Sequence, residues 1–470
     1  MAEPLRLAFQ GAARTVTGSR HLLRRGAQSW LFDCGLYQGH RDEADRVNRT
    51  FAFAPAGLEA VVVSHAHLDH TGNLPTLVHQ GFRGAIHATS ATADLSRPML
   101  ADSAFLMERD LEHVNRRLQE KHQPPRKPLY RPADVTPTLD ALRSHGYHEP
   151  WALADGLEVA YWDAGHILGS ALTTFTFRAN GRTLRLGMTG DLGRPRRPIL
   201  RDPEVFPGVD VLVMESTYGD RTHPPEEESV RRLKEVMTRT IGRGGRVIVP
   251  SFAVERTQEL VATLHGLLGR HEVPDVPIFV DSPLARVATE VFRHHPECFD
   301  EETSRIFERE NGAPFGFGRL RYVSSSEESK ALNDRTEPCV ILAASGMCEG
   351  GRVLHHLRFG IGDPRNTVLF VGYQAEGTLG RRILEGAEVV NVFGEPVTRR
   401  CEVASLQGFS AHADQTELLA WVARLDPAPR RIFLVHGDAA PAEALAGRLR
   451  ERTSAEVAIP APGEEVALWS

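Results

Sequence analysis

The fold is decided by one stretch of the chain, Val61-Val62-Val63-Ser64-His65-Ala66-His67-Leu68-Asp69-His70. Its apolar, β-branched beginning predicts a buried strand. The residues that follow, Thr71-Gly72-Asn73-Leu74-Pro75, predict a turn that opens a helix. Three histidines and one aspartate are therefore expected at the carboxyl end of a strand, where α/β sheets usually place their ligands.

The polar half of this stretch favours metal binding over a plain polar loop. Imidazole and carboxylate groups at this density suit divalent metals, and they would be costly to bury without partners. His65 and His67 are two positions apart, so an extended backbone directs both to the same side. Asp69 and His70 lie at the expected helix start and point elsewhere. The pattern divides into ligands for two neighbouring metals.

The motif His-x-His-x-Asp-His after a hydrophobic strand resembles that of the metallo-β-lactamase superfamily. That superfamily includes lactamases, thioesterase-like glyoxalases, sulfatases and nucleases. The resemblance therefore implies a fold and leaves the substrate to be decided by the rest of the chain.

Size and composition limit the classes of protein to which the chain can belong. A chain of 470 residues exceeds one ordinary core, so two domains are expected. The net charge of −6 argues against a generally basic nucleic-acid coat, although a local basic groove or a phosphate-binding metal stays compatible with it. The five cysteines form no C-x-x-C pair, so no zinc ribbon is expected, and an odd, scattered set predicts reduced thiols and a cytoplasmic protein. The amino terminus has no signal-peptide pattern, and no run approaches the roughly 18 apolar residues of a membrane span.

Other candidate ligands follow predicted strands further along the chain. Asp33 ends one such strand, where it is either a turn former or a carboxylate that orients a metal-bound histidine. His166 lies in a glycine-flanked turn after another strand. Unless it is purely structural, it completes a trio with His65 and His67 on one zinc. Asp191 ends a further strand after a glycine, which fits a carboxylate that bridges two metals.

The second metal, with Asp69, His70 and Asp191, still lacks a donor. His436 follows an apolar strand in the same arrangement as the opening stretch, and it is the predicted last ligand. A long segment then separates ligands of one site, which implies an inserted domain. The expected domains are residues 1–209, 210–395 and 396–470.

The predicted insertion repeats a unit of apolar strand, small-residue turn and helical pattern, which indicates a parallel α/β sheet. Several helix amino termini then face one edge, where anions bind well, although such sheets bind many ligands.

Outside the insertion, residues 91–122 have helical spacing, and residues 138–144 are expected to form a short helix.

Four further sequences resemble those of the β-CASP nucleases: Glu215 in Glu-Ser-Thr-Tyr-Gly, the run Gly372-Tyr373-Gln374-Ala375-Glu376-Gly377-Thr378-Leu379-Gly380, His412 in Ser-Ala-His-Ala-Asp, and His436 in Val-His-Gly. That group includes the cleavage subunit of eukaryotic mRNA 3′-end processing and related bacterial and archaeal ribonucleases. The resemblance covers nearly the whole chain. It implies an α/β fold, a metallo-β-lactamase αββα sandwich with an inserted parallel α/β β-CASP domain. The DNA-repair branch typically lacks a histidine at the last position, so His436 favours RNA.

The resemblance implies a ribonuclease that hydrolyses single-stranded RNA through a hydroxide shared by two metals, leaving 5′-phosphate and 3′-hydroxyl ends. A cleft between two domains is expected to admit a single strand better than a stiff duplex. His412 is expected to protonate the leaving 3′ oxygen, with a pKa raised by Glu215. The expected site comprises the metal ligands His65, His67, Asp69, His70, His166, Asp191 and His436, the catalytic residues Asp69, Glu215 and His412, the orienting Asp33, and the phosphate contacts Ser345, Gly346 and Ser410.

Several alternatives stay open at this point. They are a hydrolase of small esters or lactams, a non-catalytic RNA-binding subunit, and a DNA-directed or dual-specificity nuclease. The expected cofactor is a pair of zinc ions, with manganese as the alternative. Endonucleolytic and 5′-exonucleolytic action are both compatible with the sequence. The expected partner is single-stranded RNA, a homodimer is compatible with the sequence, and no membrane association is expected.

Overall fold

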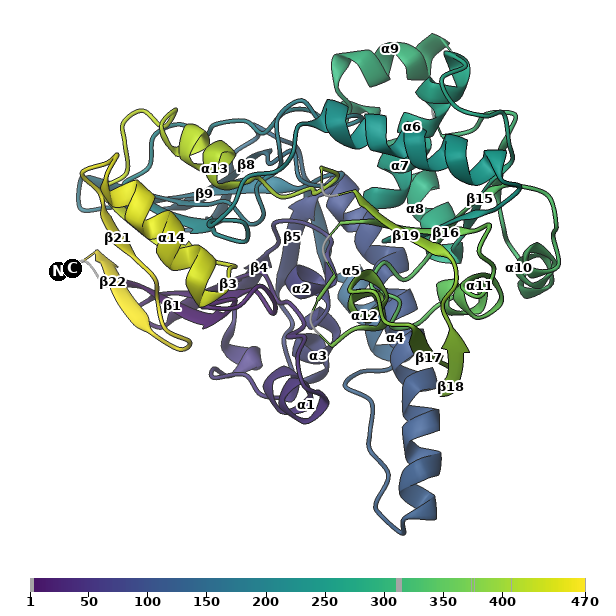
Figure 1. Ribbon diagram of the computed structural model, residues 1–470. Coiled ribbons are helices and arrows are strands. Elements are labelled where there is room, and N and C mark those ends of the chain that lie inside the picture. Colours follow the sequence, from purple (N-terminus) through teal and green to yellow (C-terminus); the bar gives the residue numbers. More distant parts are fainter. Residues whose placement is uncertain (1–3, 310–314, 373, 376, 407, 470) are drawn as a thin grey trace. The chain divides into compact units, whose positions relative to one another are not determined.

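The computed structural model describes residues 4–309, 315–372, 374–375, 377–406 and 408–469 (Figure 1). Two of the residues quoted above, Tyr373 and Glu376, lie outside this described part. The chain divides into two units. The first unit consists of Met1–Pro195, Asp202–Thr222 and His412–Ser470, and the second of Arg196–Arg201 and His223–Ala411.

Two seven-stranded sheets form the centre of the first unit. The first sheet has the strand order β22 (Glu465–Trp469), β1 (Leu5–Gly11), β2 (Arg20–Arg25), β3 (Gln28–Phe32), β4 (Ala60–Val62), β5 (Ala85–Thr89) and β6 (Leu142–His145). The second has the order β21 (Glu456–Ala458), β20 (Arg431–Val435), β11 (Val211–Glu215), β10 (Arg182–Met188), β9 (Ala171–Ala179), β8 (Leu157–Asp163) and β7 (Trp151–Ala154).

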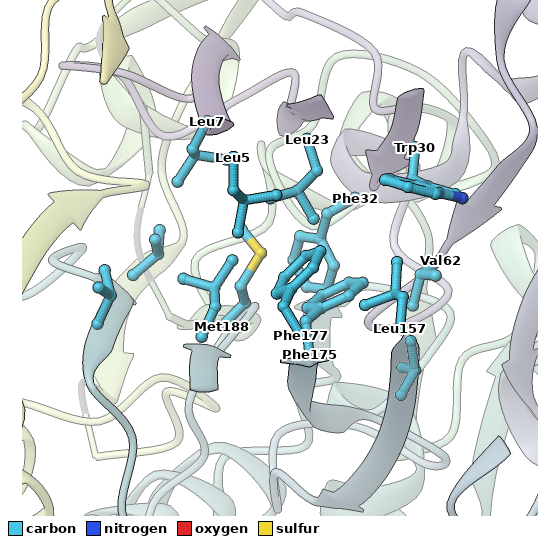
Figure 2. Packing of buried hydrophobic residues seen from close by; sticks show 14 of the residues in the cluster. Leu5, Leu7, Leu23, Trp30, Phe32, Val62, Leu157, Phe175, Phe177 and Met188 are labelled. Atoms are coloured by element: carbon cyan, nitrogen blue, oxygen red, sulfur yellow. The ribbon is translucent and has the colours of Figure 1, made fainter. Parts of the chain in front are cut away.

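The two sheets of the first unit pack face to face through apolar side chains (Figure 2). Leu7 and Phe32 from the first sheet share one buried cluster with Phe175, Phe177 and Met188 from the second. The rings of Phe32 and Phe175 meet edge to face, with their centroids 6.2 Å apart. Close packing of this kind resists small displacements, so it fixes the position of each strand end relative to its neighbours.

Helices cover the outer face of each sheet. Leu74 and Leu77 of α3 (Leu74–His79) pack against the first sheet. Leu418 of α13 (Gln415–Val422) and Leu445 of α14 (Ala439–Arg450) pack against the second. This order of layers confirms the predicted αββα sandwich. The helices of the first unit are α1 (Arg41–Arg49), α2 (Leu68–Thr71), α3 (Leu74–His79), α4 (Ser90–Glu120), α5 (Pro132–Asp140), α13 (Gln415–Val422) and α14 (Ala439–Arg450), with a short 3-10 helix at Pro55–Gly57.

The second unit is built on a six-stranded sheet in which every described strand pair is parallel. This confirms the predicted parallel α/β architecture. Its strands, in spatial order, are β14 (Leu320–Tyr322), β13 (Ile278–Asp281), β15 (Val340–Ala343), β12 (Val247–Pro250), β16 (Thr367–Val371) and β19 (Glu402–Leu406). A separate hairpin is formed by β17 (Val389–Val392) and β18 (Glu395–Thr398).

Helices lie on both faces of this parallel sheet. Leu264 of α7 (Arg256–Gly269) belongs to the buried cluster on one face, and Leu357 of α11 (Val353–Gly360) belongs to the cluster on the other. The helices of the second unit are α6 (Glu226–Gly242), α7 (Arg256–Gly269), α8 (Pro283–His294), α9 (Glu301–Arg309), α10 (Ser326–Asn333), α11 (Val353–Gly360) and α12 (Leu379–Leu384), with a 3-10 helix at Pro296–Cys298.

The main segment of the second unit, His223–Ala411, begins and ends later along the chain than the insertion expected at residues 210–395, and the short segment Arg196–Arg201 joins it from outside that range. Strand β11 pairs in parallel with β10 and β20, so residues 210–222 belong to the first unit. Strand β19 pairs in parallel with β16, which extends the second unit to Ala411. The apolar pattern of a strand shows that the strand is buried but does not show which neighbour it pairs with.

The region after the long helix α4 also differs from the sequence expectation. Instead of a helix over residues 138–144, helix α5 ends at Asp140 and strand β6 follows it. Strand β6 pairs in parallel with β5, so pairing with the sheet overrides the local pattern.

Within the described ranges, no helix combines the length and apolar composition that a membrane span requires.

Candidate metal centre

One rim of the first unit gathers side chains from the carboxyl ends of strands in both sheets. His67 begins helix α2 as its N-cap residue, and Asp69 and His70 lie within that helix. An isolated backbone bridge between Gly193 and His412 brings the late histidine to the same rim. The strand ends contribute Asp33 after β3, His65 after β4, His166 after β8, Asp191 after β10, Glu215 as the last residue of β11, and His436 after β20.

The first group of potential ligands is His65, His67, His166 and Asp191, whose ligand atoms all lie within 4.8 Å of one another. His67 Nδ1 lies 3.1 Å from His65 Nε2 and 3.4 Å from His166 Nε2. Asp191 Oδ2 lies 3.4 Å from His65 Nε2 and 3.5 Å from His166 Nε2. Four donor atoms therefore face a common point, as the sequence predicted for this trio and its carboxylate.

The second group is Asp69, His70 and His436. His436 Nε2 lies 3.2 Å from His70 Nε2 and 3.5 Å from Asp69 Oδ2. The other oxygen of Asp191, Oδ1, lies 3.2 Å from His70 Nε2. The two carboxylate oxygens of Asp191 thus face different groups, which is the geometry that a bridging ligand needs.

The protonation of these side chains fits a divalent cation. Burial lowers the pKa of His65 and His166 well below the ordinary value and that of His67 to about 4. Neutral imidazoles offer the lone pairs that metals require. Asp191 Oδ1 is buried and accepts no hydrogen bond from the described residues. Burial also opposes a charge on His70, yet the carboxylates of Asp191 and Asp33 raise its pKa well above the usual range. The same negative potential favours a bound cation.

Asp33 holds His70 in a fixed orientation. Its carboxylate accepts hydrogen bonds from Ser19 Oγ at 3.1 Å, from Ser64 N at 2.8 Å and from Ser64 Oγ at 3.0 Å. Oδ2 also lies 2.7 Å from His70 Nδ1. With Nδ1 engaged in this way, Nε2 of His70 is left to face Asp191. This geometry is what a carboxylate that orients a metal-bound histidine would need, and that role of Asp33 stays a prediction.

The third group, Asp191, Glu215 and His412, has a different character. His412 Nδ1 lies 3.1 and 3.2 Å from the two carboxylate oxygens of Glu215, which is fully buried. Glu215 Oε1 also accepts a hydrogen bond from Leu192 N at 2.6 Å. Burial alone would lower the pKa of His412, but Glu215 and Asp191 together raise it to about 9. The group therefore suits holding a proton better than holding a metal.

The backbone near Asp191 has to approach the loop after β4 closely. Gly190 adopts a φ of +54°, and a Cβ atom placed on it would lie 2.5 Å from Ser64 Cβ. Only glycine fits this conformation and this space without displacement. The glycine before the bridging aspartate is thus explained by the contact between the two sheets at this rim.

Thr217 is a member of the site that sequence reasoning missed. Its Oγ1 donates a hydrogen bond to the carbonyl of His436 at 2.9 Å and lies 3.2 Å from His436 Nδ1. The hydroxyl oxygen can therefore accept a hydrogen bond from Nδ1–H of His436, a tautomer in which Nε2 carries no proton and can serve as a ligand. Thr217 is two positions after Glu215 in the quoted Glu-Ser-Thr-Tyr-Gly motif, and that spacing was the available signal.

Three residues expected to contact phosphate belong to the second unit, and their role stays a prediction. Ser345 Oγ accepts a hydrogen bond from Glu349 N at 3.2 Å. The carbonyl of Gly346 accepts one from Gln374 Nε2 at 3.1 Å. Ser410 is buried.

Three family descriptions match successive parts of the chain. They are the metallo-β-lactamase superfamily over residues 18–212, the β-CASP domain over residues 257–383, and the Zn-dependent metallo-hydrolase RNA specificity domain over residues 396–460. A crystal structure of a protein of unknown function from Enterococcus faecalis V583 superposes with a TM-score of 0.54 at 12% identity, covering 99% of this chain and 100% of that one. At that identity the superposition concerns the fold alone.

Named relatives match over most of the chain. Ribonuclease TTHA0252 of Thermus thermophilus is 40% identical over 464 residues, which cover 98% of this chain and 100% of the relative. The transcription termination factor FttA of Methanosarcina mazei is 32% identical over 448 residues, covering 92% of this chain and 67% of the factor. The FttA of Thermococcus kodakarensis is 36% identical over 393 residues, covering 81% and 58%. With these matches and this site, the chain belongs to the β-CASP family of the metallo-β-lactamase superfamily.

Proposed function

We propose that this protein is a zinc-dependent ribonuclease that hydrolyses single-stranded RNA and leaves 5′-phosphate and 3′-hydroxyl ends. The observation that carries the proposal is the convergence of seven potential ligands on two points beside the His412–Glu215 pair. The match to an RNA specificity domain and the Thermus relative that is named a ribonuclease support RNA as the substrate.

Each group of ligands would hold one divalent ion. His65, His67 and His166 would hold the first, and Asp69, His70 and His436 the second, with Asp191 touching both. When bound, a pair of ions supplies an activated water and neutralises charge on the phosphate oxygens. The imidazole-rich donor set favours zinc, and manganese is the alternative.

His412 would hold the proton that the leaving 3′ oxygen requires. Its Nδ1 is engaged by Glu215, and its Nε2 lies 3.9 Å from Asp191 Oδ2, so Nε2 is next to the first group. Glu215 would keep the imidazole protonated and oriented.

Asp69 keeps 22% of its side chain exposed, against 4% for His436. Asp69 is therefore the ligand of the second group best placed to contact the attacking water.

The deep burial of the candidate ligands favours single-stranded RNA over a duplex as the substrate. The side chains of His65, His166 and Asp191 are at most 1% exposed. A stiff duplex would be held away from groups buried this deeply, whereas the phosphate of a flexible strand can approach them. DNA-directed or dual-specificity cleavage is the second candidate, because the same geometry would act on either backbone. Self-association into a homodimer stays a prediction.

The ends of the products test the chemistry. Attack by water with loss of the 3′ oxygen should leave a 5′-phosphate and a 3′-hydroxyl on an end-labelled single-stranded RNA. Attack by the neighbouring 2′-hydroxyl would instead leave a cyclic phosphate, and such ends would contradict the proposal. A matched DNA oligonucleotide, a β-lactam and a thioester serve as competing substrates. Rapid hydrolysis of the β-lactam or the thioester without RNA cleavage would refute the ribonuclease assignment.

His412→Ala and His436→Ala should fail in different ways. His436→Ala removes a ligand, so we expect weaker binding of one metal ion in an elemental analysis after dialysis. His412→Ala should keep both ions and lose turnover by about two to four orders of magnitude, the usual contribution of a general acid. Loss of a metal from His412→Ala, together with full occupancy in His436→Ala, would show that these roles are reversed.

Asp33→Asn should lower metal affinity without changing the size of the side chain. The amide cannot accept all the hydrogen bonds that the carboxylate accepts from Ser19, Ser64 and His70, so the His70 ring loses its fixed tautomer. We expect zinc affinity to fall about 10- to 100-fold in a competition with a chelator. Ser19→Ala, which removes one hydroxyl donor, is the matched control. Equal affinities for Asp33→Asn and Ser19→Ala would argue against the orienting role.

A further inference from the structure

One aromatic ring lies beside the proposed proton donor and has no part in the chemistry described so far. Tyr218 follows Glu215 by three positions, and an isolated parallel bridge links its backbone to Asp414. Its ring centroid lies 6.1 Å from that of His412, with the ring planes at 68° to each other. The side chain of Tyr218 is partly exposed. All of these residues belong to the first unit.

Arg221 completes a flat surface at this position. Its guanidinium carbon lies 5.8 Å from the centroid of the Tyr218 ring. Asp220 fixes the guanidinium through hydrogen bonds of 2.7 Å from Nε and 3.0 Å from Nη2. The side chain of Arg221 is 52% exposed. A ring and a guanidinium held together in this way offer the planar surfaces on which nucleobases stack.

We propose that Tyr218 and Arg221 form a binding subsite for a nucleobase, namely the base of the nucleotide on the 5′ side of the cleaved bond. The inference rests on the proposed ribonuclease function. The leaving 3′ oxygen would lie at His412 and belongs to that nucleotide. Its base is attached to the same ribose, and the Tyr218 ring lies next to His412. Every base has a π face, so the subsite would position the strand with little sequence preference.

A purely structural role is the competing explanation. The Tyr218 ring could brace the His412 imidazole and do nothing else, because edge-to-face contacts of this kind also occur in protein cores. The two explanations predict different effects on cleavage when the base is removed. If the ring stacks on the base, the effect of mutating Tyr218 depends on whether that base is present. If the ring only holds His412 in position, the effect of the mutation is the same with or without the base.

A double cycle of enzyme and substrate changes separates the two. Wild type and Tyr218→Ala are assayed on an RNA oligonucleotide with one mapped cleavage site, either intact or abasic at the nucleotide 5′ to the bond. Each change alone should lower kcat/KM about 10- to 100-fold, the range expected for loss of one stacked base. Together they should cause little further loss, because both remove the same contact. Tyr218→Phe keeps the ring and should restore sensitivity to the abasic change.

Other results would overturn the inference. Losses that multiply would show that the ring does not contact that base. A fall in kcat with an unchanged KM and a shifted pH profile would show that Tyr218 only braces His412. If Tyr218→Ala does not fold, Arg221→Ala takes its place in the same cycle, because its side chain is largely exposed. Absence of RNA cleavage by the wild type would instead refute the proposed function, which is a separate outcome.

Discussion

The first unit depends on keeping seven mostly buried polar side chains around two points. Imidazoles and carboxylates in this position would be expensive to bury without compensation. Hydrogen bonds inside the chain compensate part of this cost, such as those that Asp33 accepts and those that Thr217 makes with His436. The atoms that face inward, including Asp191 Oδ1, are left for a cation. Folding and metal binding are therefore linked at this rim.

The two packed sheets explain how such a site can be held. The ligands follow strand ends, and the strand ends are fixed by the close-packed layer that contains Phe32 and Phe175. Two residues of the rim, Asp33 and His436, adopt left-handed backbone conformations with φ of 59° and 46°. Such conformations cost about 1–3 kcal/mol each for residues other than glycine. The surrounding hydrogen bonds and packing stabilise them, and in return the side chains point into the site.

The convergence of the candidate ligands could be predicted from the sequence better than the pairing of the strands. His65, His166, Asp191 and His436 could be found because each follows the end of a predicted strand, and the structure brings all four together. The pairing of β11 could not be found in this way, since its apolar pattern is the same in either unit. The hydrogen bond from Ser19 to Asp33 could not be predicted either. It joins the ends of two strands, and their register is defined only in the folded sheet.

We propose that this rim would hold two metal ions, with Asp191 as a ligand common to both. X-ray diffraction measured on both sides of the zinc absorption edge, from crystals grown with zinc, tests it most directly. We expect two anomalous peaks per chain, one among His65, His67 and His166 and one among Asp69, His70 and His436, each within bonding distance of a different Asp191 oxygen. A single peak at full occupancy, or a peak held by Glu215 and His412, would contradict it.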